Sequence, residues 1–347
     1  MSGVQTVEVS SEEADQRLDR WFRKRFPQVR QGMIEKMCRK GEIRVDGGRV
    51  KASTRLEAGQ SVRVPPLPDE APEPQAPRPR VSDADAEMMR RAVLYRDDHI
   101  IAINKPPGLP SQGGSKQTRH VDGLAEALKF GLDEKPRLVH RLDKDTSGVL
   151  LLARTAKVAG ALTAAFRARE TRKIYWAVVA GVPHPRMGTI RYGLVKAPGR
   201  GAKGEAEKML CVHPNEVDST PDAKRAVTDY AVLSALGRRA AWMALVPITG
   251  RTHQLRAHMA EMGHPIVGDG KYGGSGQENL GDGWGAQLGG DISRKLHLHA
   301  RSISLTHPVT GAQLQIIAPL PEHMERTWKT MDWNAADVPL DPFEEIE

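Results

Sequence analysis

The sequence predicts an α+β fold with two domains. A length of 347 residues exceeds what one small core usually organises. A stretch rich in proline, from Pro65 to Arg80, divides the chain into a short N-terminal part and a long C-terminal part. After residue 92, strand and helix patterns follow one another without strict alternation, which favours an α+β domain over a doubly wound one.

The N-terminal part, residues 1–66, has the pattern of a small α/β domain. Residues 17–25 and 31–40 predict two helices, because apolar side chains recur at the spacing of one buried face. In the second helix Met33, Ile34, Met37 and Cys38 are expected to point inward, and Gly41 is expected to end it. A hairpin over 42–50 and a strand over 61–64 would complete a little sheet. Residues 67–91 are predicted to be a linker.

This N-terminal part also carries the charge of the whole protein. Residues 17–63 contain 14 Lys and Arg against five Asp and Glu, a net charge of +9, whereas the whole chain has +8. Five cations are predicted to contact phosphates of a polyanionic partner, and a nearly one-signed surface favours that interpretation over ordinary solvation. They are Arg30, Lys36, Arg39, Lys40 and Arg44.

The C-terminal part is predicted to comprise a domain over residues 92–330 and an acidic tail over 331–347. Its most informative segment is His140–Gly148, with sequence HRLDKDTSG, which lies between apolar runs at 138–139 and 149–153. Those runs predict buried strands, and the residues between them predict a turn. Polar groups on a loop between rigid strands are a common arrangement in active sites, although loop carboxylates often only bind backbone amides.

Two further segments carry clustered polar residues. Residues 249–259, TGRTHQLRAHM, predict a turn and a helix with Thr252 as its N-cap, ending at Gly263. His253 and His258 are five residues apart and do not share a helix face, so they do not predict a metal site. The second segment is Leu296–Ala300, LHLHA, in which each histidine alone would be an ordinary buried side chain.

Composition excludes several classes of protein. The two cysteines, Cys38 and Cys211, lack ligand-spaced partners, so neither a disulfide framework nor a zinc site is expected. No apolar run is long enough to span a membrane, and no signal-peptide pattern opens the sequence. The expected protein is therefore cytoplasmic, and its pI of about 9.5 favours a polyanionic partner.

Taken together and in order, the motifs resemble a known family. HRLDxxTSG at 140–148, KxY at 173–175, TGRTHQLRxH at 249–258, GHPIxGD at 263–269 and LHA at 298–300 resemble the RluA-type pseudouridine synthases. The N-terminal part resembles the RNA-binding domain named after small-subunit ribosomal protein S-four. The resemblance implies a pseudouridine synthase fold with a mixed, largely antiparallel sheet. It also implies action on 23S ribosomal RNA without a cofactor or metal, by a protein expected to be monomeric.

The resemblance also implies roles for individual residues. Asp143 would be the essential carboxylate, Arg256 would keep it ionised, and Tyr175 would stack on the flipped uracil. Asp143 could act at C1′, at uracil C6, or by removing a 2′-proton, and the sequence leaves these paths open. Substrate-binding roles are expected for Arg141, His140, Leu298 and Arg251.

Two other classes of protein remain as alternatives. A noncatalytic RNA-binding protein would need only the basic N-terminal part, but the set of Asp143, Tyr175 and Arg256 disfavours it. A glycosidase would need two carboxyl groups that flank the scissile bond, and Asp143 and Asp145 are near in sequence. A basic pI fits an enzyme of polysaccharides poorly.

Overall fold

The computed structural model describes residues 3–67, 81–113, 119–197, 208–273 and 292–343. They form two compact units, divided between Arg80 and Val81. Most of the predicted linker lies outside the described residues, as do most of residues 196–208 and 273–290, whose composition is typical of surface insertions.

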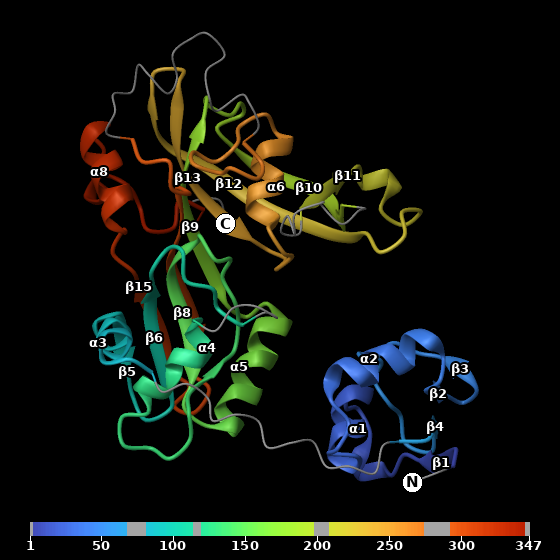
Figure 1. The fold of residues 1–347 in the computed structure, drawn as a ribbon. Helices are drawn as coiled ribbons and strands as arrows, with labels where there is room; N and C mark the ends of the chain where they lie inside the picture. The colour runs from blue at the N-terminus through green and yellow to red at the C-terminus, as the bar shows by residue number, and fades with distance from the viewer. Residues whose placement is uncertain (1–2, 68–80, 114–118, 198–207, 274–291, 344–347) are drawn as a thin grey trace. The chain divides into compact units, whose positions relative to one another are not determined.

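The first unit is a four-stranded antiparallel sheet with two helices (Figure 1). Its strands, in the spatial order β1, β4, β2, β3, are Gln5–Glu8, Ser61–Val64, Arg44–Val45 and Gly48–Arg49. Helix α1 spans Leu18–Arg25 and α2 spans Gln31–Lys40. Both helices were predicted, and Gly41 ends α2 in a left-handed conformation. Met33 was wrongly predicted to point inward: Ile34, Met37 and Cys38 complete the buried stripe, and Met33 is 42% exposed at its edge.

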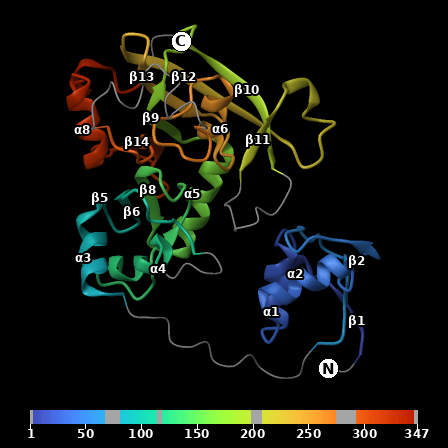
Figure 2. The ribbon, with the colours of Figure 1, turned by 45° about the horizontal axis from the view of Figure 1, so that its top comes forward.

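The second unit is built on an eleven-stranded mixed sheet, which confirms the predicted fold class (Figures 1 and 2). All pairs that the described strands form in it are antiparallel, apart from the parallel pair of β8 and β14. The strands are β5 Val93–Arg96, β6 Ile100–Lys105, β7 Arg137–Leu138, β8 Ser147–Ala153, β9 Arg172–Ala180, β10 Met187–Lys196, β11 Met209–Val212, β12 Lys224–Leu236, β13 Ala240–Pro247, β14 Leu298–Thr306 and β15 Gln313–Ile317. The α-helices are α3 Asp83–Arg91, α4 Val121–Leu124, α5 Ala156–Ala168, α6 Gln254–Glu261 and α8 Glu322–Thr330.

The central strands are buried on both faces, which explains their unbroken apolar sequence. In β8, Leu150 and Leu152 pack into the cluster beneath α3 and α4, whereas Val149 and Leu151 pack with α5. Strand β9 divides its side chains between the two faces of the sheet. Its even-numbered residues 174, 176 and 178 pack with Trp328 of α8, and Tyr175, Ala177 and Val179 face α6.

The structure differs from the predicted domain boundaries at two places. Residues 83–91, predicted as the end of the linker, form helix α3, because Ser82 caps it and Met89 is fully buried in the core. Residues 331–343, predicted as part of an acidic tail, pack on the sheet. There Met331 and Trp333 join the tryptophan cluster, and Asp341 binds Arg172 through two hydrogen bonds.

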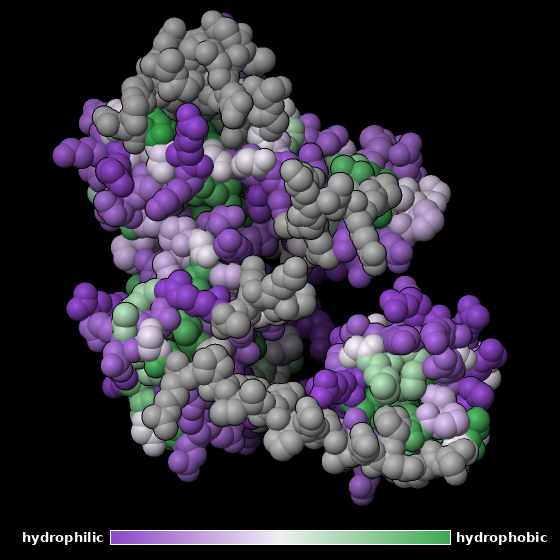
Figure 3. Space-filling view, in the orientation of Figure 1, coloured by the Kyte–Doolittle hydropathy of each residue, from purple (hydrophilic) through white to green (hydrophobic). Residues whose placement is uncertain are grey.

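The surface of the second unit in Figure 3 is mainly hydrophilic, with small separate apolar areas. None of the helices in the described ranges has both the length and the apolar character needed to cross a membrane.

Candidate active site

The loop that carries Asp143 connects β7 to β8, and hydrogen bonds from the side chains of Lys105 and Ser111 hold its backbone. The ammonium group of Lys105, a fully buried side chain at the end of β6, donates to the carbonyls of Pro106, Leu109 and Lys144 at 2.8–2.9 Å. The hydroxyl of Ser111 both donates to and accepts from the backbone of Leu142. These bonds clamp residues 142 and 144, so the carboxylate between them has a defined position.

Two cationic or polar side chains of the next motif approach this carboxylate. Arg256 Nη1 lies 3.7 Å and His253 Nε2 lies 3.9 Å from Asp143 Oδ2. Both distances are longer than a hydrogen bond, so the attraction is mainly electrostatic in this state. The side chain of Asp143 is 20% exposed, and therefore its carboxylate is accessible from the cavity.

Arg256 itself is bound by a second carboxylate that sequence reasoning did not assign. Its Nε and Nη2 donate to the two oxygens of Asp269, both at 2.7 Å. Asp269 also accepts the backbone N–H groups of Lys271 and Tyr272. Burial alone would lower the pKa of Arg256, but the hydrogen bonds and charge of Asp269 outweigh it and raise that pKa. Asp269 therefore orients a permanent positive charge toward Asp143.

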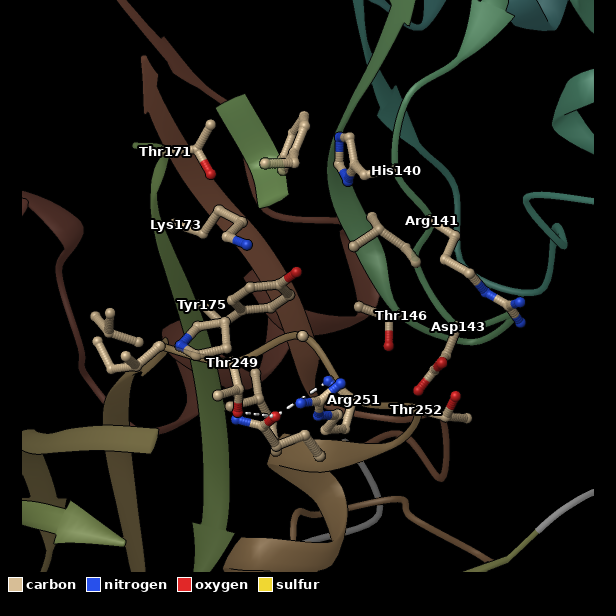
Figure 4. Close-up of a pocket in the computed structure, with 18 of the residues that line it drawn as sticks. His140, Arg141, Asp143, Thr146, Thr171, Lys173, Tyr175, Thr249, Arg251 and Thr252 are labelled. Carbon is tan, nitrogen blue, oxygen red and sulfur yellow. Dashed lines mark hydrogen bonds between the residues drawn. The ribbon is translucent and has the colours of Figure 1, made fainter. Parts of the chain in front are cut away.

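A cavity of about 810 Å³ opens in front of Asp143 (Figure 4). Tyr175 and Lys173 from β9 face it on one side, and Asp143 and Arg141 line the other. Burial, followed by the charge of Asp143, raises the pKa of Tyr175, so its hydroxyl is protonated at neutral pH. The volume falls in the range of small-molecule and nucleotide pockets.

The four predicted substrate-binding residues all line this cavity, but they differ in exposure and in their contacts. Arg141 and Arg251 are exposed, and Leu298 is buried in its wall. His140 is committed to structure: its Nε2 accepts the N–H of Leu151 at 2.9 Å and its ring stacks on Phe166. Burial lowers the pKa of His140 to about 3, so it contributes no charge to a ligand at neutral pH.

Helix α6 begins later than predicted. Thr252 was wrongly predicted as the N-cap. The helix starts at Gln254, whose side chain accepts from the Thr249 hydroxyl and the Arg251 N–H and so organises the turn. His253 precedes it with a φ of 53°, in the left-handed region, which non-glycine residues seldom adopt. This backbone conformation is concentrated at functional sites, and here it accompanies an imidazole beside Asp143.

Gly148 of the HRLDxxTSG motif and His299 of the LHA motif have packing roles. Gly148 has a φ of 109°, and a Cβ there would lie 2.6 Å from the Ala300 nitrogen and closer to its carbonyl oxygen. Only glycine therefore allows β8 and β14 to pair in parallel directly behind the Asp143 loop. His299 binds Ser147 Oγ across that pair at 2.9 Å. Within the described ranges, no group of three or more His, Cys, Asp or Glu side chains is placed to hold a metal ion.

Lys105, His253 and Asp269 are thus neighbours of the site that the sequence reading did not assign. His253 and Asp269 lie in the motifs TGRTHQLRxH and GHPIxGD, and Lys105 lies directly before two prolines, at 106 and 107. The sequence signal for such a residue is a charge next to an apolar run, as at Lys105, or between two glycines, as at Asp269. The direction of these side chains could not be read from spacing.

Comparison with known proteins places this geometry in a family. The model of the family "RNA pseudouridylate synthase" matches residues 99–261. Curated relatives named ribosomal large subunit pseudouridine synthase C include the protein of Vibrio cholerae serotype O1, 34% identical over 94% of this chain and 97% of its own length. That of Escherichia coli strain K12 is 35% identical over 93% and 95%.

A solved structure is also similar. Human RNA pseudouridylate synthase domain containing 4 is 31% identical, covers 71% of this chain and 95% of its own, and has a TM-score of 0.56. Similarity to curated relatives along nearly the full length of both chains exceeds what a shared fold alone would give. An isomerase is therefore the class of protein present, rather than a glycosidase or a noncatalytic binding protein. The chain belongs to the RluA-type pseudouridine synthase family.

Proposed function

We propose that this protein isomerises specific uridines of 23S ribosomal RNA to pseudouridine, with Asp143 as the reacting carboxylate. The observation that supports it most directly is a clamped, accessible carboxylate beside a buried guanidinium and opposite a tyrosine, in one cavity of about 810 Å³. The relatives named for the ribosomal large subunit support the substrate.

The reaction cuts the bond between C1′ and N1 of a uridine, rotates the base and rejoins it through C5. The base must leave the RNA stack to reach an enclosed site, and the detached uracil must stay there. Leu298 gives this cavity an apolar wall, and Tyr175 offers a ring on which the base can stack. No net oxidation or reduction occurs, so we propose that the protein acts without a cofactor or metal.

The charges of the site fit a carboxylate that reacts as an anion. Arg256 cannot lose its proton at physiological pH, and its buried position strengthens the interaction with Asp143. Attack at C1′, attack at C6 and removal of the 2′-proton all need an ionised Asp143. The raised pKa of Tyr175 favours a hydrogen-bond donor or acid over a base.

RNA binding is proposed for the cavity rim and for the first unit. Arg141 and Arg251 are exposed at the rim and suited to backbone phosphates. In the first unit Arg30, Lys36, Arg39, Lys40 and Arg44 are all exposed, as a phosphate-binding surface requires. Arg44 also donates to the carbonyls of Gly41 and Gly47, so it braces the hairpin as well.

The test is incubation of purified full-length protein with unmodified 23S ribosomal RNA, in buffer with a metal chelator, followed by pseudouridine mapping at single-nucleotide resolution. We expect stoichiometric conversion at a small number of uridines, and the same sites unmodified in cells that lack the gene. Modification of transfer RNA or 16S ribosomal RNA, with 23S ribosomal RNA untouched, would contradict the proposed substrate. Loss of activity with the chelator would contradict the absence of a metal.

A further inference from the structure

The contacts of His253 extend the site beyond Asp143, Tyr175 and Arg256. Its Nδ1 lies 3.0 Å from the hydroxyl of Tyr272, and its Nε2 lies 3.9 Å from Asp143 Oδ2. The Tyr272 hydroxyl in turn accepts the backbone N–H of Met209, the first residue of β11, at 2.8 Å. Met209, Tyr272 and His253 are therefore linked in a chain of contacts that ends at Asp143.

We infer that His253 is a positioning residue, locked by Tyr272 in the tautomer that carries its proton on Nε2, so that a neutral imidazole N–H is directed at Asp143. This inference rests on the proposed function of Asp143 and adds a residue and a mechanism of orientation to it.

The tautomer follows from counting protons along this chain of contacts. The Tyr272 oxygen already receives one proton from Met209, and its own single proton needs an acceptor. Nδ1 is the second contact of that hydroxyl among the described residues. If Nδ1 accepts, the imidazole proton is on Nε2. The opposite arrangement would leave the phenol proton without this acceptor and turn an imidazole lone pair toward a carboxylate.

The surroundings keep both groups in the required protonation states. Burial lowers the pKa of His253, Arg256 and Lys271 lower it further, and Asp143 and Asp269 act in the opposite direction. Burial raises the pKa of Tyr272 to about 12, so the phenol keeps its proton. The ring of Tyr272 is also packed against the Arg256 guanidinium, 5.2 Å from its centroid. Arg256 and His253 are thus positioned by the same tyrosine.

The present separation of 3.9 Å is too long for a hydrogen bond. Active-site hydrogen bonds are often long without substrate and shorten when the reacting complex forms. Asp143 would then have two different donors. Arg256 supplies fixed charge, and His253 supplies a directional N–H that holds the carboxylate plane and leaves one oxygen for the substrate.

Three variants separate a donor from a mere space-filling ring. His253→Ala removes the donor, and we expect kcat to fall roughly 10- to 100-fold with KM within about 3-fold, as for loss of a group that orients a reacting one. His253→Gln replaces Nε2–H by an amide N–H and should restore kcat to within about 5-fold. Tyr272→Phe keeps the ring against Arg256 and should lower kcat by about 3- to 10-fold, because the tautomer is no longer fixed.

A matched control is His264→Gln. This histidine binds the carbonyl of Ala180 and is not among the residues that line the cavity, so kcat should stay at the wild-type value. Thermal unfolding of every variant shows whether the fold is retained. Equal kcat in His253→Ala and wild type would overturn the inference, as would His253→Gln as slow as His253→Ala at equal stability. If Asp143→Asn is inactive in the same assay, such a result removes the role of His253 and leaves the proposed function standing.

A measurement without turnover reads the tautomer directly. In protein labelled with ¹⁵N-histidine, the signals of His253 are those of the 12 histidines that disappear in His253→Gln. We expect a protonated Nε2 and an unprotonated Nδ1 near neutral pH, and in Tyr272→Phe a mixture of tautomers. A protonated Nδ1 in the wild type, alone or in an imidazolium, would contradict the inference.

Discussion

Arg256 lies between two carboxylates that have different functions. It is 6% exposed, so it is a buried cation and not a solvated one on the helix surface. Its two-pronged bond to Asp269, at 2.7 Å, is shorter than its 3.7 Å approach to Asp143. Asp269 satisfies the buried guanidinium in the fold, and Asp143 is left accessible from the cavity. Such a division of roles is expected where a charge must be both buried and functional.

The first prediction concerns Asp269→Asn. Removing one partner of a buried ion pair leaves an uncompensated charge and typically costs about 3–5 kcal/mol of folding free energy. We expect a large drop in the urea midpoint, and a low kcat in the folded fraction because Arg256 is no longer oriented. The control is Glu322→Gln, which breaks an exposed pair with Arg326 and should leave the midpoint nearly unchanged. Equal midpoints for Asp269→Asn and wild type would contradict this account of the pair.

Asp143, Tyr175, Arg256 and Leu298 could be named from the resemblance of their motifs to the family, and all four line one cavity. Asp269 and the orientation of His253 could not be. A contact such as Arg256 with Asp269 depends on the chain returning from α6 toward the sheet, and the left-handed φ at His253 has no signature in a single sequence. Thr252 was misread as a cap because the helix begins two residues later, after His253, and no side chain caps it there.

At the scale of elements, the parallel pairing of β8 with β14 determines where the Asp143 loop lies. The two strands approach so closely at Gly148 that no side chain fits, and His299 ties β14 to Ser147 at the same level. The loop ends directly before this pair of strands. A change at Gly148 should therefore affect both stability and the site.

The second prediction compares two glycines. Gly148→Ala places a Cβ against the Ala300 backbone in a conformation with φ of 109°, and a loss of more than about 4 kcal/mol is expected from the combined clash and strain. Gly160→Ala, in the middle of α5 with open space around it, should instead stabilise by about 0.5–1 kcal/mol. Denaturant unfolding of both variants measures the difference. A Gly148→Ala variant as stable as wild type would show that the close packing is not required.

Periodicity predicted the elements well where one pattern dominated, as in α1 and α2. It failed where tertiary contacts decided. Residues 83–91 are helical because Met89 packs into the core. Residues 331–333 pack on the sheet because Trp333, together with Trp328 of α8, contacts the ring of Trp242. Both segments resemble linker or tail by composition alone.

At the scale of the molecule, each unit has its own apolar core. The cluster around Trp21 and Phe22 draws on residues up to Leu67, and the other clusters draw on residues from Val81 onward. Folding of the two units is therefore expected to be separable, which allows RNA docking and chemistry to be tested apart.

The third prediction uses a protein that begins at Val81. It should fold and keep the cavity, but it lacks the net +9 of residues 17–63, so binding to 23S ribosomal RNA should be weaker with a shallower dependence on salt. Affinities measured across a salt series test this. The same slope and affinity as the full-length protein would show that the first unit does not dock RNA.

The fourth prediction is a loss of stability in mild acid. Burial lowers the pKa of four histidines, to about 3 for His140 and His299 and about 4 for His258 and His297. Below pH 6.5 the unfolded chain binds protons that the folded chain cannot, so stability is complete above 6.5 and falls as pH decreases toward 4. Each group contributes up to about 1.4 kcal/mol per pH unit. Urea midpoints at pH 7.5 and 5.5 measure the effect, and equal midpoints would contradict it.

The central claim is that Asp143 is the reacting carboxylate, and its neighbour Asp145 provides a matched control. Both lie on the same loop, but Asp145 is exposed and outside the main cavity. Single-turnover release of tritium from RNA labelled at uracil C5 measures the chemistry directly. We predict that Asp143→Asn lowers this rate by orders of magnitude with RNA affinity within a few-fold, while Asp145→Asn stays near wild type. Substantial turnover by Asp143→Asn, or inactive Asp145→Asn beside active Asp143→Asn, would contradict the account.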